Sequence, residues 1–259
     1  MQALPAYDIE GSGPPVLVMH GWGGCAASMR PVVQALNENG FSAIVPDFHG
    51  HGRTPPPPQA WDVDDYAAAV LALLDELRVV RCDIVAHSFG GRVALVLASG
   101  FPDRVGRMVL TGCAGVRPKR TLKGRLRVAG FKCAKRLARW SFARKLLRVF
   151  GIDVAKKVAQ AGSADYRAIT DETLRQTFVR VVNQDLTPRL AQIKAPAILL
   201  WGRADTDTPM WMGETMQRQM QDAALIPLEG GHFAYLEQSF AFQRIMLAFF
   251  KNEGRNHGG

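Results

Sequence analysis

The stretch CDIVAHSFGGRVALVLAS, residues 82–99, contains the junction that decides the fold. Its first part is a short apolar run typical of a buried strand, and its last part is patterned as a helix. Between them AHSFGG follows the pattern small-x-Ser-x-Gly, in which a serine lies at a strained turn from strand to helix. The residues two positions either side of Ser88 must be small; Gly90 meets this fully and Ala86 adds one methyl group. The pattern alone is weak, but its strand–turn–helix context makes Ser88 a candidate nucleophile.

Short apolar runs alternate with longer amphipathic runs along the rest of the chain. The short runs do not alternate polar and apolar residues, so we expect strands that are buried on both faces, as in a parallel sheet. They are VLVMH (16–20), FSAIVPD (41–47), CDIVAH (82–87), VGRMVLTG (105–112), AILLWG (197–202) and AALIPLE (223–229). Residues 63–77 have helical spacing, with Asp62 as the expected N-cap. This alternation predicts an α/β fold with a doubly wound, mostly parallel sheet of seven to eight strands.

The strand–helix alternation fails from about residue 115 to residue 186. That segment is patterned as helix without a convincing strand, and it is too long for a plain loop in a compact domain. We therefore predict a helical cap over 115–186, inserted between two parts of one core at 1–114 and 187–252. The polar, Gly-rich residues 253–259 are expected to form a flexible tail.

The net charge of +9 is concentrated in one part of the chain. Residues 117–160, here called the basic segment, contain fifteen Lys and Arg against one acid, Asp153, whereas the remaining residues carry 17 basic and 22 acidic side chains. Three interpretations stay open: a solvated face, an attraction for anionic substrates, or peripheral contact with an anionic membrane surface. Nucleic-acid binding is not expected, because the segment has no recognised reading motif.

Composition narrows the class of protein further. Hydrophobic residues make up 47% of the 259 residues, which indicates a globular chain. The N-terminus lacks the pattern of a signal peptide, and no apolar stretch approaches the length of a membrane span. Four cysteines lie far apart and form no C-x-x-C pair, so we expect reduced thiols and a cytoplasmic location. No cofactor or metal is expected, and the spacing of His20, His49, His51 and His87 favours structural hydrogen bonding over metal binding.

A nucleophilic serine requires a base and an acid that orients the base. A strand-to-helix turn that carries a nucleophilic serine is called a nucleophile elbow. In folds built around such an elbow, the serine comes first in the chain, then the acid and then the histidine. Only His232 and His257 follow Ser88, and His232 comes directly after the last predicted strand, whereas His257 lies in the tail. His232 is therefore the expected base. For the acid, Asp205 and Asp207 both follow the strand 197–202; Asp205 is the better choice because it is nearer the strand end, and Asp207 is expected to cap the next helix.

The oxyanion of such a reaction requires two N–H donors. One is expected to be the backbone N–H of Phe89, which follows the nucleophile at the start of a helix. The second is expected from the loop HGWGG (20–24), with the backbone N–H of Trp22 as the candidate.

Five motifs occur together in the order and at the spacing of the capped α/β-hydrolase superfamily, which the chain resembles over about residues 5–250. They are HGWGG (20–24), PDFHGHGRT (46–54), AHSFGG (86–91), WGRADTDTP (201–209) and GGHFAYLEQ (230–238). The resemblance implies an eight-stranded sheet in which strands three to eight are parallel. Only some 15 residues precede VLVMH, so the first antiparallel strand is expected to be missing or very short.

The resemblance and the triad together favour a serine hydrolase that cleaves carboxylic esters of small to medium size through an acyl-enzyme. Haloalkane dehalogenases and epoxide hydrolases need aspartate at the position of Ser88, and proline iminopeptidases need cap carboxylates that a cap with few acids does not supply. Carbon–carbon bond hydrolases acting on anionic dienoate products remain alternatives, as do monoacylglycerol or lysophospholipid lipases. A binding protein without turnover is the alternative from another class. The acyl chain length and the oligomeric state do not follow from the sequence.

Overall fold

The computed structural model describes residues 4–117, 166 and 168–252 of the chain. Their core is a seven-stranded sheet with the strand order β1-β3-β2-β4-β5-β6-β7. The strands are β1 (Tyr7–Gly11), β2 (Pro15–Met19), β3 (Ser42–Pro46), β4 (Cys82–His87), β5 (Val105–Thr111), β6 (Ala197–Gly202) and β7 (Ala223–Leu228). Strands β2 to β7 pair in parallel, and β1 alone is antiparallel, to β3. The predicted doubly wound, mostly parallel sheet is confirmed.

The central strands form because their side chains are buried on both faces of the sheet. Side chains at alternate positions of β2 and β4, such as Leu17 and Ile84, belong to one apolar cluster, and their neighbours Val18 and Val85 belong to a second cluster on the opposite face. Each of these side chains has no exposed surface. A strand with two buried faces reads as a continuous apolar run, which is the pattern seen in the sequence.

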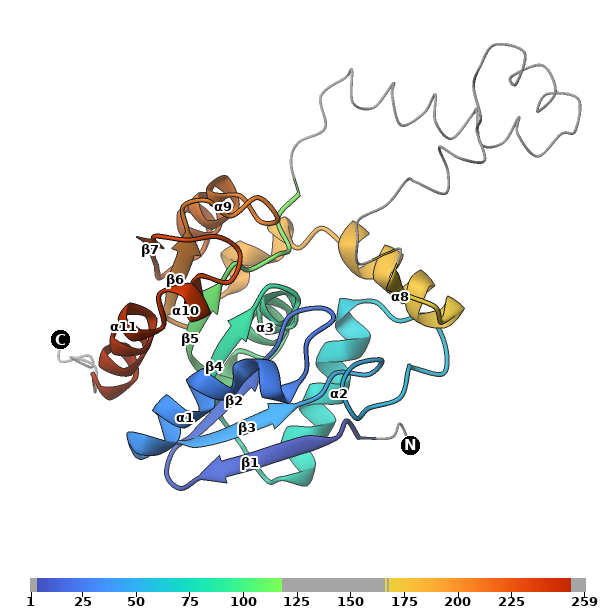
Figure 1. The fold of residues 1–259 in the computed structure, drawn as a ribbon, viewed down its shortest axis with the longest axis horizontal. Helices are drawn as coiled ribbons and strands as arrows, with labels where there is room; N and C mark the ends of the chain where they lie inside the picture. Colours follow the sequence, from blue (N-terminus) through green and yellow to red (C-terminus); the bar gives the residue numbers. More distant parts are fainter. Residues whose placement is uncertain (1–3, 118–165, 167, 253–259) are drawn as a thin grey trace, which may run out of the picture. The chain divides into compact units, whose positions relative to one another are not determined.

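Helices cover both faces of the sheet (Figure 1). α1 (Arg30–Glu38) and α11 (Ser239–Lys251) pack in the cluster that contains Val18, whereas α2 (Val63–Glu76), α3 (Phe89–Gly100) and α9 (Met210–Gln219) pack in the other. Short helices connect these elements: η1 (Ala26–Met29), η2 (Pro102–Arg104), η3 (Thr187–Gln192) and α10 (Ala234–Glu237). The predicted N-cap of α2 is confirmed, because the Asp62 carboxylate accepts hydrogen bonds from the N–H groups of Asp64 and Asp65.

Within the described residues the sheet has one strand fewer than the eight that the resemblance implies. Its N-terminal edge is the five-residue strand β1, which pairs with β3 from Tyr7 opposite Pro46 to Gly11 opposite Ser42. The described chain thus begins the sheet with a single antiparallel strand and continues directly into the parallel strands. This agrees with the expectation that the first antiparallel strand is missing or very short.

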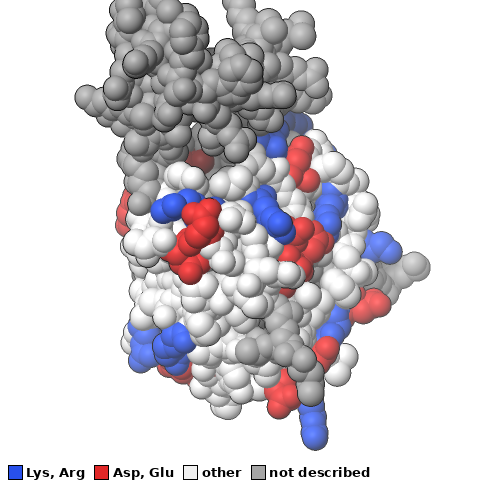
Figure 2. Space-filling model, turned by 90° about the vertical axis from the view of Figure 1, so that its right-hand side faces the viewer, with Lys and Arg blue, Asp and Glu red and all other residues white. Residues whose placement is uncertain are grey.

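The chain divides into two compact units, Met1–Arg117 with Asp171–Gly259, and Pro118–Thr170. α8 (Glu172–Asn183) belongs to the first unit, although the sequence placed it within the predicted cap over 115–186. Residues 118–165, which carry most of the basic segment, lie outside the described residues, so the predicted helical cap remains a prediction there. On the described face shown in Figure 2, acidic and basic side chains are interspersed in small groups.

Two further expectations concern the environment of the chain. Among the described residues, no helix is long and apolar enough to cross a membrane. The described cysteines, Cys25, Cys82 and Cys113, are all free thiols. Burial raises the pKa of Cys82 and that of Cys113 to about 12, so both thiols are inert protonated groups in the core.

Candidate active site

Ser88 lies at a sharp turn between β4 and α3. Its backbone has φ 51° and ψ −107°, a left-handed conformation that is rare for a residue other than glycine. Two hydrogen bonds hold this turn, from the N–H of Ser88 to the carbonyl of Thr111 and from the N–H of Ala114 to the carbonyl of Ser88. The strain is thus maintained by the end of the neighbouring strand β5, as is common at functional sites.

The turn is possible only because the residues two positions before and after Ser88 are small. A Cβ atom on Gly90 would lie 2.7 Å from the carbonyl oxygen of Met19 and 2.8 Å from that of His20. Both obstacles are backbone atoms of β2 and its following loop, which cannot move aside cheaply. Ala86, by contrast, is fully buried among apolar residues and its methyl group is accommodated. The departure from glycine at position 86 therefore leaves the elbow intact.

The structure brings Ser88, His232 and Asp205 together, although Ser88 lies more than 100 residues from the other two in the chain. The Oγ of Ser88 lies 3.0 Å from Nε2 of His232, and Nδ1 of His232 lies 2.9 Å from Oδ2 of Asp205. Ser88 follows β4, Asp205 follows β6 and His232 follows β7, so all three lie beyond the carboxyl ends of parallel strands. Ligand sites of doubly wound sheets are found at this end.

Asp205 is an ionised carboxylate with every oxygen occupied. Its Oδ1 accepts hydrogen bonds from the N–H groups of Asp207 and Thr208, each at 2.9 Å, and its Oδ2 accepts one from the Thr208 hydroxyl at 2.7 Å in addition to His232. Burial alone would raise the pKa of Asp205, but the hydrogen bonds from His232 and Thr208 outweigh it and hold the pKa below 3.8. The carboxylate therefore fixes the His232 tautomer in which Nδ1 carries the proton.

Asp207 contributes its backbone N–H to Asp205. Its expected role as the N-cap of the next helix is wrong, because α9 begins at Met210 with Pro209 at the N-cap position and no side-chain cap. Pro209 takes the position because a helix start tolerates its fixed backbone angle.

Thr208 and Gly112 are two parts of the site that the sequence did not reveal. The Thr208 hydroxyl, which bonds to Asp205, also lies 3.0 Å from the Gly112 carbonyl oxygen and 3.2 Å from Nδ1 of His232. Gly112 has φ +50°, and a Cβ there would lie 3.1 Å from Nδ1 of His232. The signals available in the sequence were a threonine three residues after the acid and a glycine directly after a buried strand.

The two predicted oxyanion donors lie in neighbouring segments. Phe89 is the first residue of α3, where a helix leaves its N–H groups without partners inside the helix and its dipole favours an anion. The ring centroids of Trp22 and Phe89 are 5.2 Å apart, and the two rings meet edge to face. The loop 20–24 is therefore in contact with the start of α3, as an oxyanion site requires.

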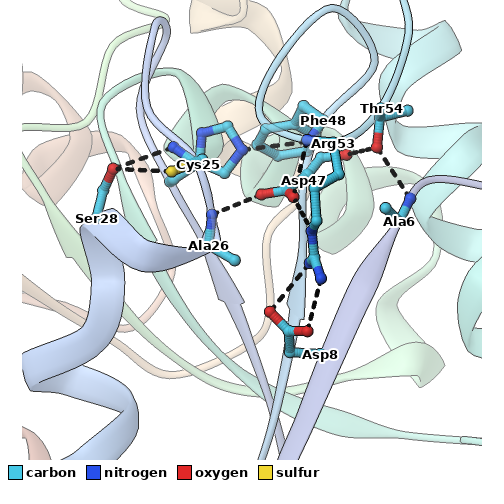
Figure 3. A network of polar contacts seen from close by, with 10 residues as sticks. Ala6, Asp8, Cys25, Ala26, Ser28, Asp47, Phe48, Arg53 and Thr54 are labelled. Atoms are coloured by element: carbon cyan, nitrogen blue, oxygen red, sulfur yellow. Dashed lines mark hydrogen bonds and ion pairs between the residues drawn. The ribbon is translucent and has the colours of Figure 1, made fainter.

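Two buried polar side chains hold the loop 20–24 and the start of η1 that follows it. Nδ1 of His20 donates to the Gly21 carbonyl at 2.7 Å, and its Nε2 accepts from the N–H of Phe48 at 3.1 Å. Asp47 accepts the N–H of Ala26 at 2.6 Å and is held in turn by Arg53, whose guanidinium also binds Asp8 (Figure 3). Burial lowers the pKa of His20, which favours the neutral ring. A neutral ring with its proton on Nδ1 is also the state that both hydrogen bonds require.

Aromatic rings contact the side chain of Trp22 in this loop. The ring centroid of Trp22 lies 4.6 Å from that of His51 and 5.0 Å from that of Phe178. Phe178 comes from α8, which is also joined to the loop after β3 by a hydrogen bond from the N–H of Trp61 to the Thr177 hydroxyl. Aromatic side chains from three segments therefore pack around Trp22, whose backbone N–H is a predicted oxyanion donor.

The remaining histidines of the region carry structural bonds. His51 donates through Nδ1 to the His49 carbonyl, and burial together with the nearby His20 lowers its pKa to about 4. His87 binds the carbonyl of His232 through Nε2. No group of three or more His, Cys, Asp or Glu able to hold a metal occurs in the part of the chain that the structure describes.

Comparison with known proteins places this geometry among hydrolases. The chain is 30% identical to a 2-hydroxy-6-oxononadienedioate/2-hydroxy-6-oxononatrienedioate hydrolase of Burkholderia vietnamiensis, over 95% of this chain and 90% of the relative. It is 25% identical to the pyrrolizixenacetamide deacetylase of Xenorhabdus hominickii, over 97% of this chain and 96% of the relative.

A solved structure and a family model agree with these relatives. The crystal structure of a hydrolase from Pseudomonas aeruginosa matches with a TM-score of 0.72 and 25% identity, covering 95% of this chain and 93% of the other. The model of the alpha/beta hydrolase fold family matches residues 14–239, a range that includes Ser88, Asp205 and His232. The chain therefore belongs to the alpha/beta hydrolase fold family.

Proposed function

We propose that the chain is a serine hydrolase that cleaves small to medium carboxylic esters through an acyl-enzyme. The observation that carries this proposal is the hydrogen-bonded series from Ser88 through His232 to Asp205, with contacts of 3.0 and 2.9 Å. A serine hydroxyl is a weak nucleophile unless an adjacent base removes its proton, and His232 is the adjacent base.

In the proposed reaction the Oγ of Ser88 attacks the ester carbonyl while Nε2 of His232 takes its proton. Asp205 keeps Nδ1 of His232 protonated and stabilises the imidazolium that forms. His232 then gives the proton to the leaving alkoxide, which departs and leaves an acyl group on Ser88. A water molecule activated by His232 releases the acid and restores Ser88.

The negative charge that develops on the carbonyl oxygen requires donors that are already in position. The backbone N–H groups of Phe89 and Trp22 are proposed for this role, and removal of one such donor typically raises the barrier by about 2.7–4 kcal/mol. Support comes from the position of Phe89 at the start of α3 and from the anchoring of the Trp22 loop by His20.

A carbon–carbon bond hydrolase is the second candidate, and the relatives favour it. The 30% identical protein of Burkholderia vietnamiensis is named for hydrolysis of a 2-hydroxy-6-oxo dienedioate, and its match covers 95% of this chain. Ester and carbon–carbon cleavage share the attack of Ser88 on a carbonyl and differ in the leaving group. An ester releases an alkoxide, whereas the dienoate must release a carbanion that its conjugated system stabilises. The uncharged aromatic contacts of Trp22 with Phe89 and Phe178 support the ester reaction, and the relatives' names support the other.

Substrate hydrolysis separates these two reactions. The assay compares p-nitrophenyl esters of graded chain length with an anionic 2-hydroxy-6-oxo dienoate. We expect kcat/KM to be higher for one of the esters than for the dienoate by at least about tenfold. A higher value for the dienoate would replace the ester proposal with the second candidate.

Labelling with a fluorophosphonate probe separates an enzyme from a binding protein of the same fold. Wild type is expected to be labelled, and Ser88→Ala is expected not to be. Ser99→Ala is the matched control, because Ser99 lies at the far end of α3 and its hydroxyl donates to the Val96 carbonyl. Equal labelling of wild type and Ser88→Ala would remove Ser88 from the nucleophile position.

The surroundings of the enzyme remain part of the proposal. The dispersed thiols favour a cytoplasmic location. For the basic segment the same three interpretations stay open: a solvated face, attraction of an anionic substrate, or contact with an anionic membrane surface. Co-sedimentation with vesicles tests the membrane interpretation. Equal recovery with zwitterionic vesicles and with vesicles containing phosphatidylserine would contradict it.

A further inference from the structure

His87 connects two members of the candidate triad, the nucleophile Ser88 and the base His232. It is the last residue of β4 and directly precedes Ser88, and its Nε2 lies 3.0 Å from the backbone carbonyl oxygen of His232. The two residues are 145 positions apart in the chain. The base and the nucleophile are thus connected twice, once through their side chains and once through His87.

The direction of this bond follows from its acceptor. A carbonyl oxygen only accepts, so Nε2 of His87 must carry a proton. Burial is the largest influence on this ring, and together with the neighbouring His232 it lowers the pKa of His87 to about 3. His87 is therefore a neutral ring with its proton on Nε2 and none on Nδ1 across the working range of a hydrolase.

The ring of His87 is held firmly enough to define the position of its N–H. Its centroid lies 4.7 Å from that of His232, 5.2 Å from that of Phe233 and 4.9 Å from that of Tyr235. On its other edge, a Cβ atom on Gly21 would lie 2.8 Å from Nδ1. The ring thus occupies a gap between the loop that carries His232 and the loop of the oxyanion donors, with 3% of its surface exposed.

The loop that carries His232 needs such an anchor. It follows β7 with two consecutive glycines, and Gly230 has φ +112°, a conformation open only to glycine in practice. Other bonds hold the loop on either side: the N–H of Ala204 donates to the Gly230 carbonyl, and the N–H of Gly231 donates to the Glu237 carboxylate. At His232 itself, the backbone carbonyl is bound by His87.

We propose that His87 is a positioning residue, whose Nε2–H holds the backbone of His232 at the distance from which its ring reaches Ser88. The inference rests on the proposed function, because it assigns His87 to the same triad. It goes beyond that function in giving a role to the last residue of β4, directly before the nucleophile. A displacement of about 1 Å at a reacting group is enough to cost about 100-fold in rate, so a single backbone anchor has a measurable effect.

Two variants of similar length separate the hydrogen bond from the packing of the ring. His87→Gln places an amide N–H near the position of Nε2, whereas His87→Met fills similar space without a donor. We expect His87→Met to lower kcat on a p-nitrophenyl ester by about tenfold or more, with KM within about twofold, because substrate binding does not use this bond. His87→Gln is expected to recover most of the lost kcat.

Labelling with the fluorophosphonate probe distinguishes a failure of the proposed role of His87 from a failure of the proposed function. Labelling of Ser88 in wild type with an unchanged rate in His87→Met would overturn the role of His87 and leave the proposed function standing. Equal losses of kcat in both variants, accompanied by equal losses of Tm, would also overturn it, since the packing of the ring would then be what matters. Absence of a Ser88 adduct in wild type would overturn the proposed function.

The tautomer of His87 provides a test that needs no variant to fold. Nuclear magnetic resonance of the wild-type chain with 15N-labelled histidine distinguishes a ring protonated at Nε2 from one protonated at Nδ1. We expect His87 to be the neutral Nε2–H form from pH 5 to pH 8. A ring protonated at Nδ1, or a ring that titrates in this range, would contradict the proposal.

Discussion

At the scale of single residues, the acid of the triad is defined by what binds it. Asp205 and Asp207 are two positions apart and both follow β6, so sequence position separates them only weakly. The two differ in surroundings: the Asp205 side chain is buried and its oxygens are occupied by His232, Thr208 and the backbone, whereas Asp207 is exposed. A buried carboxylate that accepts four hydrogen bonds keeps its negative charge.

Asp205→Asn should therefore reduce activity far more than Asp207→Asn. The amide presents no negative charge to Nδ1 of His232 and favours the wrong tautomer, and a comparable change in a serine protease triad costs roughly 10⁴-fold in kcat. We expect a loss of at least about 10³-fold for Asp205→Asn and less than about threefold for Asp207→Asn, measured with a p-nitrophenyl ester. Similar losses in both variants would mean that the acid has been assigned wrongly.

Thr208 gives a second prediction at this scale. Its hydroxyl donates to Oδ2 of Asp205 at 2.7 Å and is fully enclosed by the site. Thr208→Val keeps the shape and removes the donor, so we expect kcat to fall by about tenfold, the value of one hydrogen bond to a charged group. Thr208→Ser retains the donor and should stay within about threefold of wild type. If Thr208→Val had the same kcat as wild type, the hydroxyl would not contribute to catalysis.

At the scale of elements, the junction of β4 and α3 depends on close backbone contact. The N–H of Gly90 donates to the His20 carbonyl, which brings α3 against the loop that follows β2. Any side chain at Gly90 would meet two backbone oxygens at 2.7 and 2.8 Å. The turn at Ser88 and the loop 20–24 are therefore one packed unit.

Gly90→Ala should lower the free energy of unfolding by about 1–3 kcal/mol, because the added methyl group overpacks a rigid contact. It should also abolish most activity, since the Phe89 N–H would be displaced. Gly100→Ala is the control in the same helix: nothing lies within 4 Å of its added Cβ, so its stability should be unchanged or slightly higher. Urea unfolding of the two variants measures both effects. Equal stability of Gly90→Ala and wild type would contradict the close contact.

At the scale of the whole molecule, burial of neutral histidines sets the response to acid. Burial lowers the pKa values of His20, His51 and His87, the last two to about 4 and about 3. In the unfolded chain a histidine titrates near pH 6.5, so below that pH the unfolded state binds protons that the folded state does not. Stability is therefore complete above about pH 6.5 and falls as the pH drops.

Each of these histidines contributes a slope of up to about 1.4 kcal/mol per pH unit once the unfolded chain is protonated. We expect urea unfolding between pH 6 and pH 5 to show uptake of two to three protons. Asp83, whose pKa burial raises, offsets part of this at lower pH. His51→Gln should reduce the uptake by about one proton. A free energy of unfolding that does not change between pH 7 and pH 5 would contradict the prediction.

The fold was readable from the sequence because its strands are buried on both faces. Apolar runs such as 82–87 and 197–202 carry their own signal, and Ser88 stands where one run ends and a helical pattern starts. His232 and Asp205 could be named because few residues of the right kind follow strands after Ser88. The motifs therefore predicted which side chains meet.

Other parts of the site have no such local signal. Gly112 and Thr208 contact the triad only because β5 and β6 lie side by side. The sequence of neither segment predicts that these two strands pair. The same holds for His87, whose partner is 145 residues away. Asp207 was assigned to the wrong structural role because a helix start accepts either an aspartate cap or a proline, and here Pro209 takes the position.

The most direct test of the central claim is to trap the acyl-enzyme itself. Rapid acid quenching during turnover of a p-nitrophenyl ester, followed by intact-mass measurement and peptide mapping, shows where the acyl group resides. A covalent acyl group on Ser88, formed with a burst of p-nitrophenolate and absent from Ser88→Ala, is the predicted result. Turnover by Ser88→Ala at the wild-type rate, or an acyl group on another residue, would contradict the account.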